Sequence, residues 1–354
     1  VVKAREVREQ DHKNAIFRLS GWYMANMLLV KAASLWLLPI YTRYLTPSDF
    51  GVLRTLTSTA MAFPMLISLS LGAAYTRFYF TECEKENGLK RLVSTYFWFI
   101  LIWGLMVTIL GNVICDQFLR HRLKVSFWPY VPLALAVPLI QQLATMGSVH
   151  FKLRLQAKKI SVIDTITFVV GTATTLYLLV AMKYGVLSML IGGVSAAVLA
   201  LCIYVSVLLR ADLLSFQFDF DILKKGLRFS LPYVPMLACS WIAGLSDRLV
   251  ILFYGTTANV GLYSLGYDIG RTMNVVSASI NRVFDPVLWS TITTDVERAK
   301  ERIERYLPFY FWVTFGAACT LSLFAKEIIL GLTDSKFHSA WVVTPIVAFA
   351  YLVA

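Results

Sequence analysis

The stretch YTRYLTPSDFGVL, Tyr41 to Leu53, has a later counterpart in ILFYGTTANVGLY, Ile251 to Tyr263. Three positions are identical at a common offset of 210 residues: Tyr44 and Tyr254, Thr46 and Thr256, and Gly51 and Gly261. Each stretch is a short polar link between two long apolar runs. The pattern predicts that the chain builds one outward hairpin twice, as part of an internal repeat.

The composition is that of a membrane protein. The chain is 58% hydrophobic and 15% charged, with a mean hydropathy of +0.66, whereas soluble domains carry about 25% charged residues. Ten apolar runs approach or exceed the ~20 residues that cross a bilayer as a helix. They are Leu19–Ile40, Phe50–Ala74, Leu92–Ile114, Val125–Phe151, Ile160–Met182, Val186–Leu209, Phe229–Tyr254, Val260–Trp289, Tyr306–Phe324 and a run from Ala340. We predict an all-α polytopic membrane protein.

The connecting loops predict the orientation. Alternate loops, starting with the N-terminal segment, hold about three times as many Lys and Arg residues as the others. Because cytoplasmic loops carry this excess, we expect the N-terminus on the cytoplasmic side of the inner membrane. Basic loops facing anionic lipid account for the net charge of +12, so membrane lipids are expected partners and nucleic acid is not.

The spans divide into two expected lobes. Residues 1–214 would form an N-terminal lobe of six helices, and residues 215–354 a C-terminal lobe with four. An even number of spans per lobe keeps the two in parallel orientation, as in transporters that place a substrate path between two repeats. A complete second lobe would need six spans, and the last run reaches Ala354 without a polar flank, so we expect the C-terminal lobe to be truncated in this chain.

Ionisable residues inside the spans are the candidate site, because an unpaired charge facing lipid is costly. The bases are Lys31, Arg54, Arg248, Arg271 and Arg282, and the acids that orient or exchange partners with them are Asp247, Asp268 and Asp285. In the eighth span, polar residues recur at steps of three or four from Asp268 to Asp285, which predicts one helical stripe with pairs Asp268–Arg271 and Arg282–Asp285. The stripe would line a translocation path or, alternatively, form a structural seam between helices.

Guanidinium groups suit a pyrophosphate head, whose oxygens they can meet bidentately. We therefore expect an anionic lipid-linked substrate. A second tier holds Arg18 and Arg77 at the cytoplasmic mouth, which are alternatively ordinary membrane anchors, and Asn274 and Tyr267 as partners for sugar. The five scattered cysteines fit apolar packing, and no cofactor or metal is expected.

Two segments resemble a known family. LLPIYTRYLTPSDFGVL, Leu37–Leu53, is similar to the end of the first helix and the next loop of Wzx-type flippases, which are lipid-linked oligosaccharide transporters of the multidrug/oligosaccharidyl-lipid/polysaccharide (MOP) exporter superfamily. Gly226–Gly270 resembles their seventh and eighth helices, with a proline near the start, an Asp-Arg pair and a G-L-Y step. The resemblance implies two six-helix bundles around a central cavity, alternating access, and substrate contacts from basic residues on the first, second, seventh and eighth helices.

The expected function is translocation of a pyrophosphate-linked oligosaccharide for cell-surface polysaccharide biosynthesis, without catalysis. Coupling to an ion gradient or membrane potential and contact with other polysaccharide-assembly proteins are further expectations. One alternative is a cation-coupled multidrug exporter of the same superfamily, which is expected to present acids in an apolar cavity. Another is a polytopic glycosyltransferase or ligase, which usually needs a sizeable extramembrane loop with acid–base groups.

Overall fold

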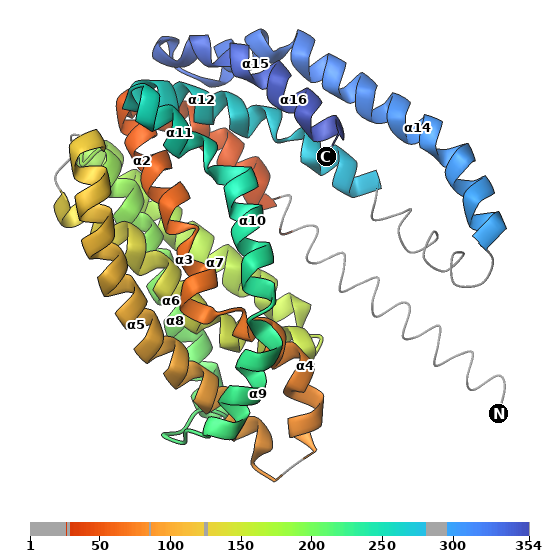
Figure 1. The fold of residues 1–354 in the computed structure, drawn as a ribbon. Helices are drawn as coiled ribbons and strands as arrows, with labels where there is room; N and C mark the ends of the chain where they lie inside the picture. The colour runs from red at the N-terminus through yellow and green to blue at the C-terminus, as the bar shows by residue number, and fades with distance from the viewer. Residues whose placement is uncertain (1–25, 27–28, 85, 124–126, 281–295, 354) are drawn as a thin grey trace. The chain divides into compact units, whose positions relative to one another are not determined.

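The computed structural model describes residues 26, 29–84, 86–123, 127–280 and 296–353. Helices dominate these residues, which include no strand (Figure 1). By their contacts they form two compact units: unit 1 holds Val52–Tyr254 with the residues before Trp36, and unit 2 holds Trp36–Gly51 with Gly255–Ala354. The division into lobes at residue 214 stays a prediction.

Six described helical stretches are long and apolar enough to cross a membrane, and a bent pair of helices makes a seventh. The six are Pro47–Cys83, Gly88–Gln117, Trp128–Leu153, Ala157–Ala181, Val186–Arg210 and Lys300–Leu323, and the bent pair covers Tyr233–Leu245 and Asp247–Tyr254. Each coincides with a predicted run. The predicted first and eighth runs lie partly outside the described residues, and the all-α polytopic prediction is confirmed.

The first long span is broken twice. It consists of α2 (Pro47–Ala60), α3 (Phe63–Ser68) and α4 (Leu71–Cys83). Pro64 lies in the first turn of α3, where a proline lacks only a hydrogen bond that the helix start does not make. Leu69 and Ser70, with φ of 45° and 61°, separate α3 from α4. Pro64 therefore follows directly on the first of the two breaks.

Long helices form the bulk of unit 1. They are α5 (Gly88–Leu123), α6 (Phe127–Leu153), α7 (Ala157–Leu176), which continues as the π-helical turn η1 (Tyr177–Ala181), and α8 (Val186–Arg210). Helices α6, α7 and α8 pack side by side (Figure 1). Gly171 and Gly192 face each other across the α7–α8 contact, where an added Cβ would meet the opposite helix. Small residues allow this close approach of membrane helices.

A tethered linker, residues 211–219, leads from α8 to α9 (Phe220–Ser230), α10 (Tyr233–Leu245) and α11 (Asp247–Tyr254). Lys90 of α5 forms an ion pair with Asp212 at 2.7 Å. The indole Nε1 of Trp98 donates to the Ser215 carbonyl at 2.8 Å, and its ring stacks on Phe216. The linker is thus held along α5.

Unit 2 contains α12 (Thr257–Gly270), α14 (Val296–Leu323), α15 (Ala325–Leu332), the 3₁₀ helix η2 (Ser335–Val342) and α16 (Val343–Val353). Gly266 and Gly270 put the backbone of α12 against η2 and α16, and the Thr344 hydroxyl donates to the Gly266 carbonyl at 3.1 Å. Asp334 caps η2, and the hydrogen bond from the Lys336 amide holds the pKa of its carboxyl below the ordinary value.

The repeated hairpin is visible in the helices that follow it. Helices α2 and α12 both have 14 residues, and their first residues, Pro47 and Thr257, are separated by the same offset as the sequence match. Their caps also correspond. Thr46 and Asp49 exchange hydrogen bonds at the start of α2, and Thr256 and Asn259 do so at the start of α12. The predicted repetition of this hairpin is confirmed.

Candidate functional site

The charged residues predicted from the sequence fall into three groups. In unit 1 the structure describes Lys31, Arg54, Asp247 and Arg248, and in unit 2 it describes Asp268 and Arg271. Arg282, Asp285 and the second-tier Arg18 lie outside the described residues.

Asp247 and Arg248 stand where the seventh span bends. Helices α10 and α11 meet at an angle of 50° at a break of one residue, Ser246. The Arg248 side chain is only 3% exposed and lies 2.9 Å from the Asp247 carboxylate, and it also donates to the Gly244 carbonyl. A buried charge needs such a partner. Discontinuous membrane helices are a common feature of transporter binding sites. The Asp247–Arg248 pair therefore stabilises the bend between α10 and α11 and lies where a transporter often binds its substrate.

Arg54 lies on the helix against which α10 rests. The Trp241 indole of α10 donates to the Ser58 carbonyl of α2 at 2.8 Å. Arg54, one turn before Ser58, is half-buried on the same helix. Lys31 occupies the helical residues 29–44, and its side chain is exposed.

Arg271 also stands at a helix break. Helix α12 ends at Gly270, and residues 271–272 form a turn before helix resumes at Met273. The predicted stripe is therefore not one continuous helix. Arg271 is exposed, and within the described part of the chain its side chain makes no hydrogen bond or ion pair, so the predicted pair with Asp268 is not formed. The backbone from Asp268 to Arg271 is still helical, since the Arg271 amide donates to the Tyr267 carbonyl at 2.8 Å. The spacing would allow the pair, but the Arg271 side chain does not form it.

The same break occurs in the first copy of the repeat. Helix α2 ends at Ala60, residues 61–62 form a turn, and α3 starts at Phe63. Met61 therefore occupies in the first copy the position that Arg271 occupies in the second. The two breaks match, but only the second carries a charge.

Tyrosines extend the unit 2 group. The hydroxyl oxygens of Tyr267 and Tyr351 lie 2.9 Å apart and share a hydrogen bond, and the Tyr263 ring is 5.8 Å from that of Tyr267. Asn274 is exposed on the helical turn after Arg271. Tyr267 and Asn274 are second-tier predictions, whereas Tyr351 was missed, because no local signal in its apolar run links it to a residue 84 positions earlier.

Arg77 of α4 lies at a contact between two helices of unit 1. Its guanidinium carbon is 4.8 Å from the centre of the Phe229 ring, a cation–π contact between α4 and α9. It therefore links two helices that pack together.

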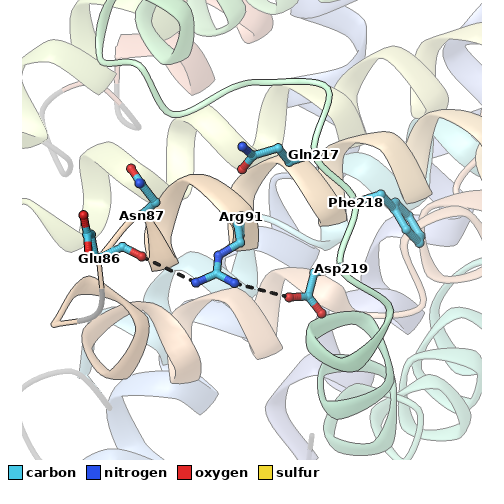
Figure 2. Close-up of a pocket in the computed structure, with 6 residues that line it drawn as sticks. All are labelled: Glu86, Asn87, Arg91, Gln217, Phe218 and Asp219. Atoms are coloured by element: carbon cyan, nitrogen blue, oxygen red, sulfur yellow. Dashed lines mark hydrogen bonds and ion pairs between the residues drawn. The ribbon is translucent and has the colours of Figure 1, made fainter.

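A polar cavity of about 570 Å³ opens beside the linker, away from the predicted charges (Figure 2). Its lining residues are Glu86, Asn87, Arg91, Gln217, Phe218 and Asp219. Figure 2 shows Arg91 between Glu86 and Asp219, donating to the Glu86 carbonyl and lying 3.9 Å from the Asp219 carboxylate. These contacts balance its charge and join α5 to the linker. Among the described residues, no group of three or more His, Cys, Asp or Glu could hold a metal ion.

Comparison with known proteins places the chain. A family model described as "Polysaccharide biosynthesis protein" matches residues 40–342. Protein 1 of the Lsg locus of Haemophilus influenzae is 20% identical over 328 residues, which cover 91% of this chain and 78% of that protein.

Solved structures of transporters have a similar fold. A multidrug resistance MATE family transporter of the MOP superfamily, in its inward-facing conformation, matches with a TM-score of 0.63 and 17% identity over 94% of this chain and 79% of that one. The outward-facing conformation matches with a TM-score of 0.61 and 18% identity, over 96% of this chain and 77% of that one. A MOP superfamily transporter from Pyrococcus furiosus, whose binding pocket is described as having reverse polarity, matches with a TM-score of 0.55 and 14% identity. The match covers 96% of this chain and 80% of that one. The chain is a multi-pass membrane protein with the MOP transporter fold, and it belongs to the polysaccharide biosynthesis protein family.

Proposed function

We propose that this protein is a flippase that carries an anionic, pyrophosphate-linked oligosaccharide lipid across the cytoplasmic membrane by alternating access. The observation that carries the proposal is Arg271, an exposed guanidinium at the helix break after α12, in a chain of the polysaccharide biosynthesis family. The break falls within the eighth span predicted from the sequence. A guanidinium in such a place can form paired, charge-assisted hydrogen bonds with phosphate oxygens.

The other described charges differ in how far they are already paired within the protein. Lys31 is exposed and, within the described residues, makes no ion pair, so it is a second free cation for the head group. Arg248 is neutralised by Asp247, and this pair exchanges partners as the substrate passes. The tyrosines of α12 and α16 offer hydroxyl and ring surfaces to sugar. Arg54, Asp268, Arg282 and Asp285 complete the proposed set, of which Arg282 and Asp285 lie outside the described residues.

The rival function is cation-coupled drug export, because two of the similar structures are those of a multidrug resistance transporter. Such a protein needs an acid free to bind a cation, whereas Asp247 is held by Arg248. The Pyrococcus furiosus transporter, whose reversed pocket polarity is said to suggest a different function, is a precedent for this fold with altered charge. We favour the flippase.

The test is transbilayer movement of a pyrophosphate-linked oligosaccharide lipid in proteoliposomes, with and without an imposed ion gradient. The variant is Arg271→Met, which installs the residue found at the equivalent break in the first repeat. Loss of a charged hydrogen bond of about 1.5–3 kcal/mol should slow movement roughly tenfold or more. Lys326→Gln, an exposed lysine of α15, is the matched control.

Movement by the wild type and the control, but not by Arg271→Met, would support the flippase. Absence of movement in every protein, together with export of an organic cation under the same gradient, would replace it with the drug exporter. Accessibility of a cysteine placed at Lys158 or Lys159, at the start of α7, from each side tests the proposed orientation, which puts this end of α7 in the cytoplasm.

A further inference from the structure

Helix α9 has two faces with different surroundings. Leu223, Gly226 and Ser230 are buried where α9 packs on α4 and α5. A side chain at Gly226 would collide with the hydroxyl of Tyr96, so this face fits closely. The packed face thereby fixes the direction of the rest of the helix.

Beside the packed face, an apolar strip is left uncovered within unit 1. Phe220, Leu227 and Leu231 follow one another along α9 and just beyond it, at the spacing that puts them on one side. Phe220 is 70% exposed and Leu231 is 47% exposed. The strip forms a groove of about 400 Å³, to which Leu223, Lys224 and Arg228 also contribute.

Basic residues run along the edge of this groove. Lys224 and Arg228 are one turn apart, both are exposed, and both line it. Asp219 is occupied at the start of the helix, where its carboxylate accepts the amides of Asp221 and Ile222. Asp221 is in the first turn, three residues before Lys224 and nearly two turns before Arg228, so this side of α9 carries two bases and one acid. The groove therefore has a cationic edge along its second half.

The surroundings of the groove are those of a membrane interface. Phe216 and Phe218, in the linker just before α9, are also exposed, Phe216 to 93%. The strip runs on into α10, where Tyr233, Met236 and Leu237 are exposed on a candidate membrane span. A helix with Phe and Leu on one side and Lys and Arg beside them is typical of segments that lie in the lipid head-group layer.

We propose that α9 is a binding site for an anionic phospholipid of the membrane leaflet at which α9 lies, with the lipid phosphate between Lys224 and Arg228 and an acyl chain in the groove formed by Phe220, Leu227 and Leu231. The charge of the edge selects an anionic head group, and the continuous apolar surface into α10 selects a lipid over a soluble anion. This site is independent of the proposed translocation and holds a resident lipid.

The test measures lipid adducts on the purified full chain by native mass spectrometry during titration with phosphatidylglycerol or phosphatidylcholine. The variants are Lys224→Gln with Arg228→Gln, and Phe220→Ser with Leu231→Ser. The control is Lys158→Gln with Lys159→Gln, which removes two exposed basic residues from the first turn of another helix, α7. Because two basic residues that attract an anionic lipid surface are removed together, the first variant should weaken phosphatidylglycerol binding about thirtyfold.

The expected pattern is selective. The charge variant should lose the preference for phosphatidylglycerol over phosphatidylcholine, the apolar variant should bind both lipids more weakly, and the control should match the wild type. Equal phosphatidylglycerol affinity in the charge variant and the control would overturn the site, as would competition by soluble glycerol phosphate at the same concentration as the lipid. If the double variant does not fold, Lys224→Gln and Arg228→Gln are measured singly against Lys158→Gln.

Discussion

Gly51 and Gly261 approach each other so closely that neither has room for a side chain. A Cβ on Gly51 would collide with the carbonyl of Thr257, and a Cβ on Gly261 with the carbonyl of Pro47. Each hypothetical Cβ lies 3.0 Å from the backbone nitrogen of the opposite glycine. Pro47 and Thr257 are themselves equivalent positions, so the two copies of the hairpin make the same contact with each other in both directions. This close contact explains why both copies have a glycine there.

Substitution of either glycine by alanine should therefore destabilise the protein. Because the obstacle is backbone, the two chains must move apart, and overpacking of this kind typically costs about 1–3 kcal/mol. Gly72→Ala is the control, because it lies in a helix with nothing within 4 Å of its added Cβ. Thermal unfolding in detergent should give lower midpoints for Gly51→Ala and Gly261→Ala than for Gly72→Ala. Equal midpoints would mean that the contact is not a tight one.

Removal of the Asp247 carboxylate should leave the buried guanidinium of Arg248 without the opposite charge beside it. We expect Asp247→Ala to destabilise the protein by about 3–5 kcal/mol, the usual effect of breaking a buried ion pair from one side. Adding Arg248→Leu to it should recover part of this loss, because the uncompensated guanidinium is then gone. A double-mutant cycle of unfolding free energies measures the coupling. Additive effects of the two substitutions would contradict an energetically important pair.

We expect Arg271→Met to be as stable as the wild type. Arg271 is exposed and its repeat counterpart is Met61, which is 60% exposed at the equivalent break. Surface substitutions of this kind usually change the free energy of unfolding by less than about 0.5 kcal/mol. Unfolding midpoints of Arg271→Met and the wild type should agree. A large loss of stability would instead assign the guanidinium to a structural seam.

The sequence was sufficient for the membrane class, the repeated hairpin and most of the spans, because long apolar runs and the three identities at a common offset can be read from the sequence directly. The break at Arg271 was missed for a physical reason. In the first copy Pro64 indicates a helix break, but the equivalent residue in the second copy is Asn274, which does not predict a break. Treating the two copies as equivalent would have transferred the break to α12.

Contacts between distant segments were beyond sequence reasoning. The pairing of Tyr267 with Tyr351, and of Trp98 with Ser215, depends on how helices pack, and neither partner lies in a recognisable pattern. The Asp247–Arg248 pair was within reach because its members are adjacent, although the bend that buries Arg248 was not.

The linker, residues 211–219, should detach from α5 more often when the Trp98 hydrogen bond is lost. Trp98→Phe keeps an aromatic ring beside Phe216 but leaves the Ser215 carbonyl without its indole donor. A hydrogen bond of about 0.5–1.5 kcal/mol corresponds to roughly two- to tenfold more frequent opening, which proteolysis reports when reclosing is fast. Chymotrypsin should cut after Phe216 or Phe218 faster in this variant. Trp36→Phe, at an indole that is 82% exposed, should leave the rate unchanged, and equal cleavage in the two variants would show that the linker is held by other contacts.

The tyrosine pair of unit 2 should show coupled stability. Tyr267→Phe and Tyr351→Phe each remove one hydroxyl of a shared hydrogen bond while keeping the ring contact at 6.2 Å. Each single substitution should cost about 0.5–1.5 kcal/mol, the net contribution of a typical intramolecular hydrogen bond. The double substitution should cost little more than either one, since the bond can be lost only once. Tyr254→Phe, at a residue that is 85% exposed, provides the control for removal of a hydroxyl alone. If the two single effects instead add up in the double variant, water or other groups satisfy the hydroxyls, and the pair does not join α12 to α16.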